Sequence, residues 1–309
     1  MTDLPEIAGL LDGVNGPCYP DWRAIAVHID TKIVETSHRE AWETASRMWV
    51  ENVCRHLGGL YRVHETKNFL ILSEAPESAM KGDREFFEQT LAGILRSLRG
   101  AAWEDVYGKR VVFVFSSAEE YYAYIAPLYP DGEHAMTGGI CLAHTGYVHI
   151  AMPLLDHSNY RCVIAHELTH VCLSQLPLPI WLNEAIAMRM EAEICHSNIF
   201  RLDREIYERH VTFWDEESIQ TFWSGASWGI AGDSNELSYS LASILWRKIE
   251  TDIGATREEA LRFLNSAHFA DAGGSAFEAC FSFTLAELVE DFLGEGHWTP
   301  DLKTSSQPS

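Results

Sequence analysis

The chain has 309 residues, of which 47% are hydrophobic and 22% are charged, as is typical of a folded globular protein with one large domain or two modest ones. There are 23 Lys and Arg against 45 Asp and Glu, which gives a formal net charge of −22. Because this charge repels phosphate backbones and anionic lipid surfaces, we expect neither nucleic acid nor a membrane as a partner.

The first half of the sequence predicts strands between helices. Residues 1–20 are punctuated by Pro and Gly, and residues 22–30 (WRAIAVHID) fit a strand and a buried helix equally well. Apolar residues at three- and four-residue steps predict an amphipathic helix over 36–57, which a Gly-Gly pair ends. Two apolar segments around His144 predict a β-hairpin over 138–153. The other expected elements are strands at 68–73 and 109–117 and helices at 82–100 and 118–126.

The second half of the sequence is almost wholly helical in pattern. Breaks rich in Gly, Ser and Asn fall at 224–234 and 271–275. Strands followed by helices indicate an α+β protein, in which a small mixed or antiparallel sheet packs on a helical half. The expected helices cover about 158–175, 181–196, 199–210, 235–252, 256–267 and 284–293.

The cysteines and the chain's N-terminal segment bear on its location. The seven cysteines are odd in number and include no C-x-x-C pair, which favours reduced thiols over a disulfide framework. The first residues lack the basic segment and apolar run of a secretory signal, and no stretch approaches the roughly 18 apolar residues of a membrane span. We therefore expect a cytoplasmic protein.

A pair of histidines four residues apart is the sharpest feature of the sequence. His166 and His170 enclose Glu167 in the motif HELTH. On a helix, residues four apart project from one face, so both imidazoles can hold a single zinc ion. Glu167 lies about 100° further round the axis, within reach of a metal-bound water. The alternative is a half-buried surface helix in which Glu167 only pairs with a neighbour.

The next helical segment offers a third ligand. After the Pro-x-Pro break at 177–179, Glu184 falls in the first turns of the predicted helix, and a short loop would bring it back towards the two histidines. Alternatively, Glu184 is a solvated acid that the helix dipole stabilises, with Asn183 or Glu191 as the oxygen donor. An unpaired acid among the apolar residues of this helix would be costly, and ligation removes that cost. We therefore expect one Zn²⁺ held by two histidines and Glu184.

These motifs resemble those of a known enzyme family. HELTH, followed after 13 residues by Glu184 in WLNEA, resembles the gluzincin metallopeptidases, in particular the peptidase MA-like family. Ala185 stands where that family usually has Gly. Weaker similarity at 111–125, 138–153 and 234–267 extends the resemblance over about 60–295.

The resemblance implies a fold and a domain organisation. It implies a zincin-like domain over 59–295, with a sheet part (59–155), a helical part (156–295) and the active-site helix between them. Residues 1–58, with one amphipathic helix, would form an N-terminal segment of unassigned role, and 296–309 a flexible tail.

The resemblance also implies a hydrolytic mechanism. Glu167 would act as general base on zinc-activated water, and Tyr239 would stabilise the oxyanion, because gluzincins typically use a Tyr or His there. Tyr239 is alternatively an ordinary amphipathic tyrosine, with His210 and His268 as other candidates. The substrate would be a peptide or protein, for which the acidic surface favours basic sequences. Alternatives are hydrolysis of a non-peptide amide or ester, and a zinc-binding scaffold or regulatory protein with little or no turnover.

Overall fold

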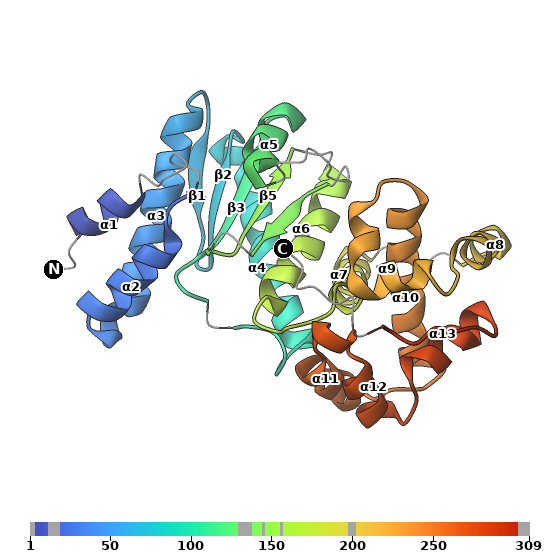
Figure 1. The fold of residues 1–309 in the computed structure, drawn as a ribbon. Coiled ribbons are helices and arrows are strands. Elements are labelled where there is room, and N and C mark those ends of the chain that lie inside the picture. The colour runs from blue at the N-terminus through green and yellow to red at the C-terminus, as the bar shows by residue number, and fades with distance from the viewer. Residues whose placement is uncertain are drawn as a thin grey trace. The chain divides into compact units, whose positions relative to one another are not determined.

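The structure is a computed structural model that describes residues 4–11, 19–104, 106–128, 138–143, 146–154, 157–196 and 202–301. It confirms the expected α+β class, with one mixed sheet in the first half of the chain and helices throughout the second (Figure 1). Two compact units are formed, the first from Met1–Leu95, Trp103–Pro130 and Thr137–Val171, the second from Arg96–Ala102, Asp131–Met136 and Cys172–Ser309. In the described part of the chain, no helix combines the length and apolarity needed to cross a bilayer.

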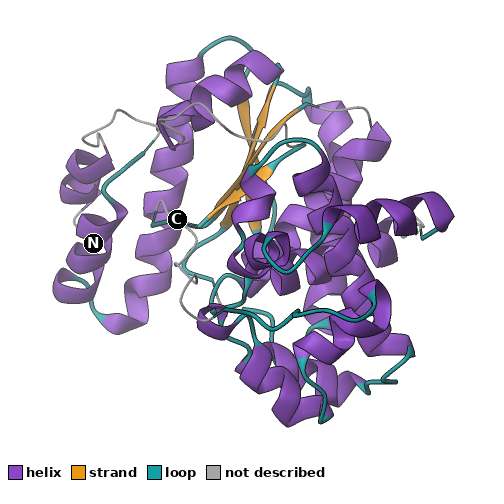
Figure 2. Ribbon diagram, turned by 45° about the vertical axis from the view of Figure 1, so that its right-hand side comes forward, coloured by secondary structure: helices purple, strands orange, loops and turns teal. Residues whose placement is uncertain are grey.

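Five strands in the order β1-β2-β3-β5-β4 form the sheet of the first unit, drawn in orange in Figure 2. The three central strands run parallel, and β1 and β4 pair antiparallel at the two edges. The central strands are buried throughout, which explains their apolar sequences. The bounds are β1 (Arg62–Glu65), β2 (Phe69–Ser73), β3 (Arg110–Phe115), β4 (Ile140–Leu142) and β5 (His149–Pro153).

Helices cover both faces of this sheet. Successive side chains of a strand point to opposite faces, so Phe69 and Leu70 of β2 lie on different sides. Leu70 belongs to the core that includes Trp49 of α3 (His38–Leu57). On the other face, Phe69 contacts Phe87 of α4 (Glu77–Ser97), which in turn contacts Tyr160, with ring centroids 5.3 and 6.4 Å apart. Tyr160 belongs to α6 (His157–Leu173), so the helix that carries HELTH covers the face opposite α3.

Most predicted elements of the first unit are confirmed, and the exceptions have physical causes. The helix predicted over 36–57 is α3, and the hairpin is the antiparallel pair β4 and β5, with His144 outside the described residues. WRAIAVHID forms the helix α2 (Trp22–Lys32), where the Asp21 carboxylate caps the Ala24 N–H at 2.9 Å. β1 was not predicted, because its sequence RVHE has too few apolar residues to reveal a strand. The remaining helices here are α1 (Leu4–Leu11) and α5 (Ala118–Ile125).

The helices of the second unit largely follow the predicted pattern. Two were not predicted, α9 (Ser218–Ser224) and α12 (Gly274–Phe281). Both are short, and α12 begins inside the Gly-rich segment 271–275 that was expected to be a break. The others are α7 (Ile180–Cys195), α8 (Arg204–Phe213), α10 (Asp233–Thr251), α11 (Arg257–Ser266) and α13 (Leu285–Leu293).

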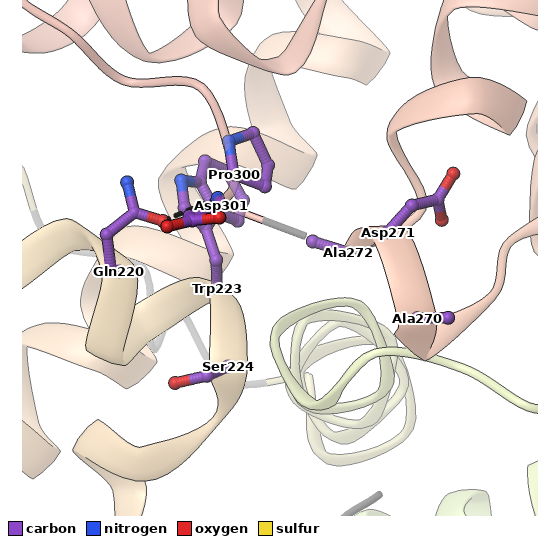
Figure 3. A pocket seen from close by; sticks show the side chains of 8 residues that line it. All are labelled: Gln220, Trp223, Ser224, Ala270, Asp271, Ala272, Pro300 and Asp301. Atoms are coloured by element: carbon purple, nitrogen blue, oxygen red, sulfur yellow. Dashed lines mark hydrogen bonds between the residues drawn. The ribbon is translucent and has the colours of Figure 1, made fainter. Parts of the chain in front are cut away.

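The last described residues are fastened to α9. The Gln220 amide donates to the Thr299 carbonyl at 3.0 Å. It also accepts from the Asp301 N–H at 2.7 Å (Figure 3). The indole of Trp223 donates to the Trp298 carbonyl at 2.9 Å. The hollow beside these bonds measures about 10 Å³, room for a single water molecule. Residues up to 301, which the sequence assigns in part to a flexible tail, are thus hydrogen-bonded, and 302–309 lie outside the described residues.

Substituting Gln220 tests this attachment. Gln220→Ala removes two hydrogen bonds, each worth about 0.5–1.5 kcal/mol, so we expect the free energy of unfolding to fall by about 1–2 kcal/mol in urea titrations. Gln89→Ala, an exposed glutamine on α4, is the control and should change it by less than about 0.5 kcal/mol. Equal stability of the two variants would contradict the role given to Gln220.

Candidate metal centre

Two imidazoles project from one side of α6. His166 and His170 are both half-buried, with ring centroids 4.8 Å apart and ring planes at 76°. The turn between them is regular, and the buried Thr169 hydroxyl donates to the Ala165 carbonyl at 2.8 Å, which keeps that polar group inside the helix. The predicted convergence of the two histidines on one face of a helix is therefore present.

The helix α7 carries Glu184 and is firmly anchored in the second unit. Trp181 is fully buried, and its indole donates to the Ala272 carbonyl at 2.9 Å. Leu182 and Ile186 are also fully buried, on either side of Glu184 in sequence. Because these apolar neighbours fix the rotation of the helix, the half-buried Glu184 has a defined direction.

His166, His170 and Glu184 form a cluster suited to a metal ion. One ligand atom from each lies within 4.8 Å of the other two. Donors about 2.1 Å from a tetrahedral zinc ion are separated by about 3.4 Å, so small side-chain adjustments suffice to close the site. Within the described residues this is the one such group of three or more His, Cys, Asp or Glu, and Glu191 does not belong to it.

Glu167 is held in a confined position. It follows His166 on α6, and 8% of its surface is exposed. Gly139, which precedes β4, approaches it closely: a Cβ at Gly139 would lie 2.7 Å from Val163 Cγ1 and 3.3 Å from Glu167 Cγ. Only glycine allows this approach, so the start of the edge strand lies directly against Glu167. Sequence reasoning missed this contact, for which the Gly-Gly pair before a short strand was the available signal.

Tyr239 is related to the metal ligands only through the packing of its helix. It is half-buried on α10, and its ring meets that of Trp228 edge-on at 6.3 Å. One turn further along α10, the Ser243 hydroxyl lies 3.2 Å from the Met188 sulfur on α7, itself one turn beyond Glu184. Tyr239 thus belongs to a helix that packs against the helix of the third ligand, and its role stays a prediction.

Three further histidines, His149, His210 and His268, have structural contacts of their own. His149 is buried, and its Nδ1 donates to the Tyr147 carbonyl at 2.9 Å while its Nε2 accepts from the Tyr124 hydroxyl at 2.7 Å. The exposed His268 accepts from the Ala270 N–H at 3.1 Å. His210 is fully buried, and both of its ring nitrogens are engaged. None of the three has a described bond to the metal ligands.

His210 gives the protein a predicted pH dependence. Its Nδ1 accepts from the Trp214 indole and its Nε2 donates to Ser240, both at 3.0 Å, which suits the neutral ring. Burial, aided by the positive charge of Arg209, lowers the pKa of His210 from 6.5 to about 4. The unfolded chain therefore binds a proton between these pH values that the folded chain does not, and stability should fall as the pH drops from about 6.5 to 4.

The variant His210→Gln isolates this effect, because its amide can serve the same two partners without titrating. The wild type should be more stable at pH 7.5, and its advantage should shrink by about 2–3 kcal/mol at pH 4.5. Urea unfolding of both proteins at each pH measures this difference. An advantage that does not change with pH would contradict the assignment of a neutral, buried His210.

Two imidazoles and one carboxylate are a donor set suited to zinc in a site that retains a position for water. The donors come from successive helices, which are joined by a turn in which Leu176 N–H donates to the Leu173 carbonyl at 2.9 Å. No protein-family model matches the chain, and no curated protein shows significant sequence similarity to it.

Proposed function

We propose that this chain is a zinc-dependent hydrolase, most simply a peptidase, in which His166, His170 and Glu184 hold one Zn²⁺. The observation that carries the proposal is the convergence of these three donors within 4.8 Å, with Glu167 next in sequence to the first. Three protein ligands leave one coordination position for water. Bound zinc would supply Lewis acidity, which polarises the scissile carbonyl and makes water a nucleophile near neutral pH.

Glu167 supplies the proton transfers. Its carboxylate takes the proton of the attacking water and returns it to the leaving amine, so that one residue acts first as base and then as acid. Its exposed fraction of 8% keeps it largely away from bulk solvent. Tyr239 is the proposed donor to the oxyanion, a role supported by its position on a helix that packs against α7.

The edge strand β4 is the proposed binding surface for the substrate backbone. β4 pairs with β5 on one side, so an extended peptide can pair with its other edge. The contact between Gly139 and Glu167 supports this role, because it brings a peptide on β4 near the general base. The net charge of −22 favours basic substrates.

A cytoplasmic location belongs to the same proposal. The six described cysteines carry thiols rather than disulfides, as expected in a reducing compartment. The alternative of a zinc-binding scaffold is less favoured, because a scaffold would not need Glu167, which ligates nothing in the proposed site.

The test is metal content and hydrolysis measured on the same protein. The chain purified without chelators should contain one zinc per molecule and cleave members of a peptide library analysed by mass spectrometry. Removal of zinc should abolish cleavage, and its return should restore it. Failure to bind zinc would overturn the metal site. Stoichiometric zinc with no hydrolysis of peptides, amides or esters would instead establish the scaffold alternative.

A further inference from the structure

A second cavity lies within the second unit, and no metal ligand lines it. Its volume is about 440 Å³, in the range of pockets that hold small organic ligands. Ile186, Trp246 and Leu264 contribute apolar walls and are at most 5% exposed. The cavity is bounded by the end of α4, by α7, α10 and α11, and by Ala255.

This cavity lies on the side of α7 opposite the metal centre. At 100° per residue, Ile186, Arg189 and Glu193 project about 140–200° round the helix axis from Glu184. A ligand in the cavity therefore meets a different face of α7 from the one that presents the third metal ligand.

Arg189, one of the charged residues that line the cavity, is already paired with acids. Arg189 donates to Glu193 at 2.5 Å and to Glu250 at 2.6 Å. Glu193 also accepts from the Ser97 hydroxyl at 2.7 Å, so both of its oxygens are used. Glu250 is bonded through Oε1 only, which leaves its Oε2 available as an acceptor in the described structure.

Arg257 provides a positive charge that has no described ion-pair partner. Its Nη2 donates to the carbonyls of Arg96 and Ser97 at 2.7 and 3.0 Å, which fixes the guanidinium at the end of α4. Its Nη1 makes no described bond, and no carboxylate among the described residues forms an ion pair with it. The group is thus held in place and can receive a carboxylate.

We propose that this cavity binds a short zwitterionic peptide with apolar side chains. Arg257 binds its carboxylate, Glu250 accepts from its ammonium group, and the apolar walls enclose a side chain. A ligand without a carboxylate would leave Arg257 without an ion-pair partner, and a ligand without an ammonium group would leave Glu250 Oε2 unused. A polyanion would be repelled by Glu193 and Glu250. This site is independent of the proposed peptidase activity, because no metal ligand contributes to it.

Isothermal titration calorimetry on metal-free protein tests the site. L-leucyl-L-leucine should bind one to one, and zinc should leave its affinity unchanged, whereas binding at the metal centre would require zinc. Glycylglycine lacks the apolar side chains, N-acetyl-L-leucyl-L-leucinamide lacks both charges, and free leucine is shorter. Glycylglycine and the blocked dipeptide should each bind at least about tenfold more weakly than L-leucyl-L-leucine. Tighter binding of leucine than of L-leucyl-L-leucine would overturn the peptide assignment.

Two variants locate the binding. Arg257→Gln removes the charge while its amide can still donate to the α4 carbonyls, and it should weaken binding about tenfold. Ala260→Leu fills the cavity from α11 and should weaken binding similarly without altering charge. Arg204→Gln, a 90% exposed arginine on α8, is the matched control and should bind as the wild type does. Circular dichroism verifies folding, and a folded Ala260→Leu with wild-type affinity would overturn the proposal.

Discussion

Replacing Glu167 by Gln should lower the kcat of peptide hydrolysis by about a hundredfold to ten-thousandfold while zinc content stays at one per chain. The amide keeps the shape of the side chain but cannot take a proton from water, and loss of a general base has an effect of this size. Since Glu167 ligates nothing in the proposed centre, the metal should be retained. Single-turnover kinetics on a cleaved library peptide, with zinc measured on the same sample, checks both statements.

The matched control for this experiment is Glu85→Gln. Glu85 is an exposed acid on α4 with no described ion pair, so its substitution changes the net charge equally without touching the site. It should leave kcat and zinc content unchanged. If the Glu167 variant hydrolyses peptide as fast as this control does, Glu167 is not the base. If it loses zinc, its carboxylate is instead part of the ligand set.

The parts of the site that were predictable are local in sequence. HELTH places two imidazoles on one helix face by periodicity alone, and any regular helix through 166–170 preserves that relation. The prediction of Glu184 as a ligand required one further inference, that the next helix turns back towards the first. The Pro-x-Pro break with its apolar flanks indicated this turn. The cluster within 4.8 Å is therefore the geometric outcome expected from two adjacent segments.

The parts that were missed depend on distant contacts. The cavity requires Arg257 to meet carbonyls at 96 and 97, about 160 positions earlier, and no periodicity encodes that encounter. The contact of Gly139 with Glu167 is likewise visible only once β4 has paired with β5 beneath α6. The strand β1 was missed for the same reason, because its pairing with β2 outweighs the weak strand propensity of RVHE.

The metal ligands and the proposed general base bear on different alternatives. A helix carrying HELTH by chance would have no reason to bring a third donor to the two histidines, whereas a ligand set must do so. The convergence of Glu184 from the next helix therefore weighs against the surface-helix alternative. It does not separate an enzyme from a scaffold, which is why the proton transfers assigned to Glu167 need a kinetic test.

Replacing His170 by Ala should remove most of the stabilisation that zinc confers. Loss of one of three protein ligands should raise the dissociation constant by more than about a hundredfold, beyond the 10- to 100-fold effect typical of groups that only support a ligand. At free zinc about 100 times the wild-type dissociation constant, zinc stabilises the wild type by about 2.7 kcal/mol and the variant by about 0.4 kcal/mol or less. Melting curves over a zinc series measure both values.

His56→Ala is the control for this titration. His56 is exposed on α3 and makes no described hydrogen bond, so its substitution removes an imidazole without affecting the proposed centre. Its melting temperature should rise with zinc as the wild type's does. If the His170 variant responds to zinc in the same way, stabilisation arises from another site and the triad is wrong. If only the His170 variant fails to respond, zinc binding is localised to α6, whatever the kinetics show.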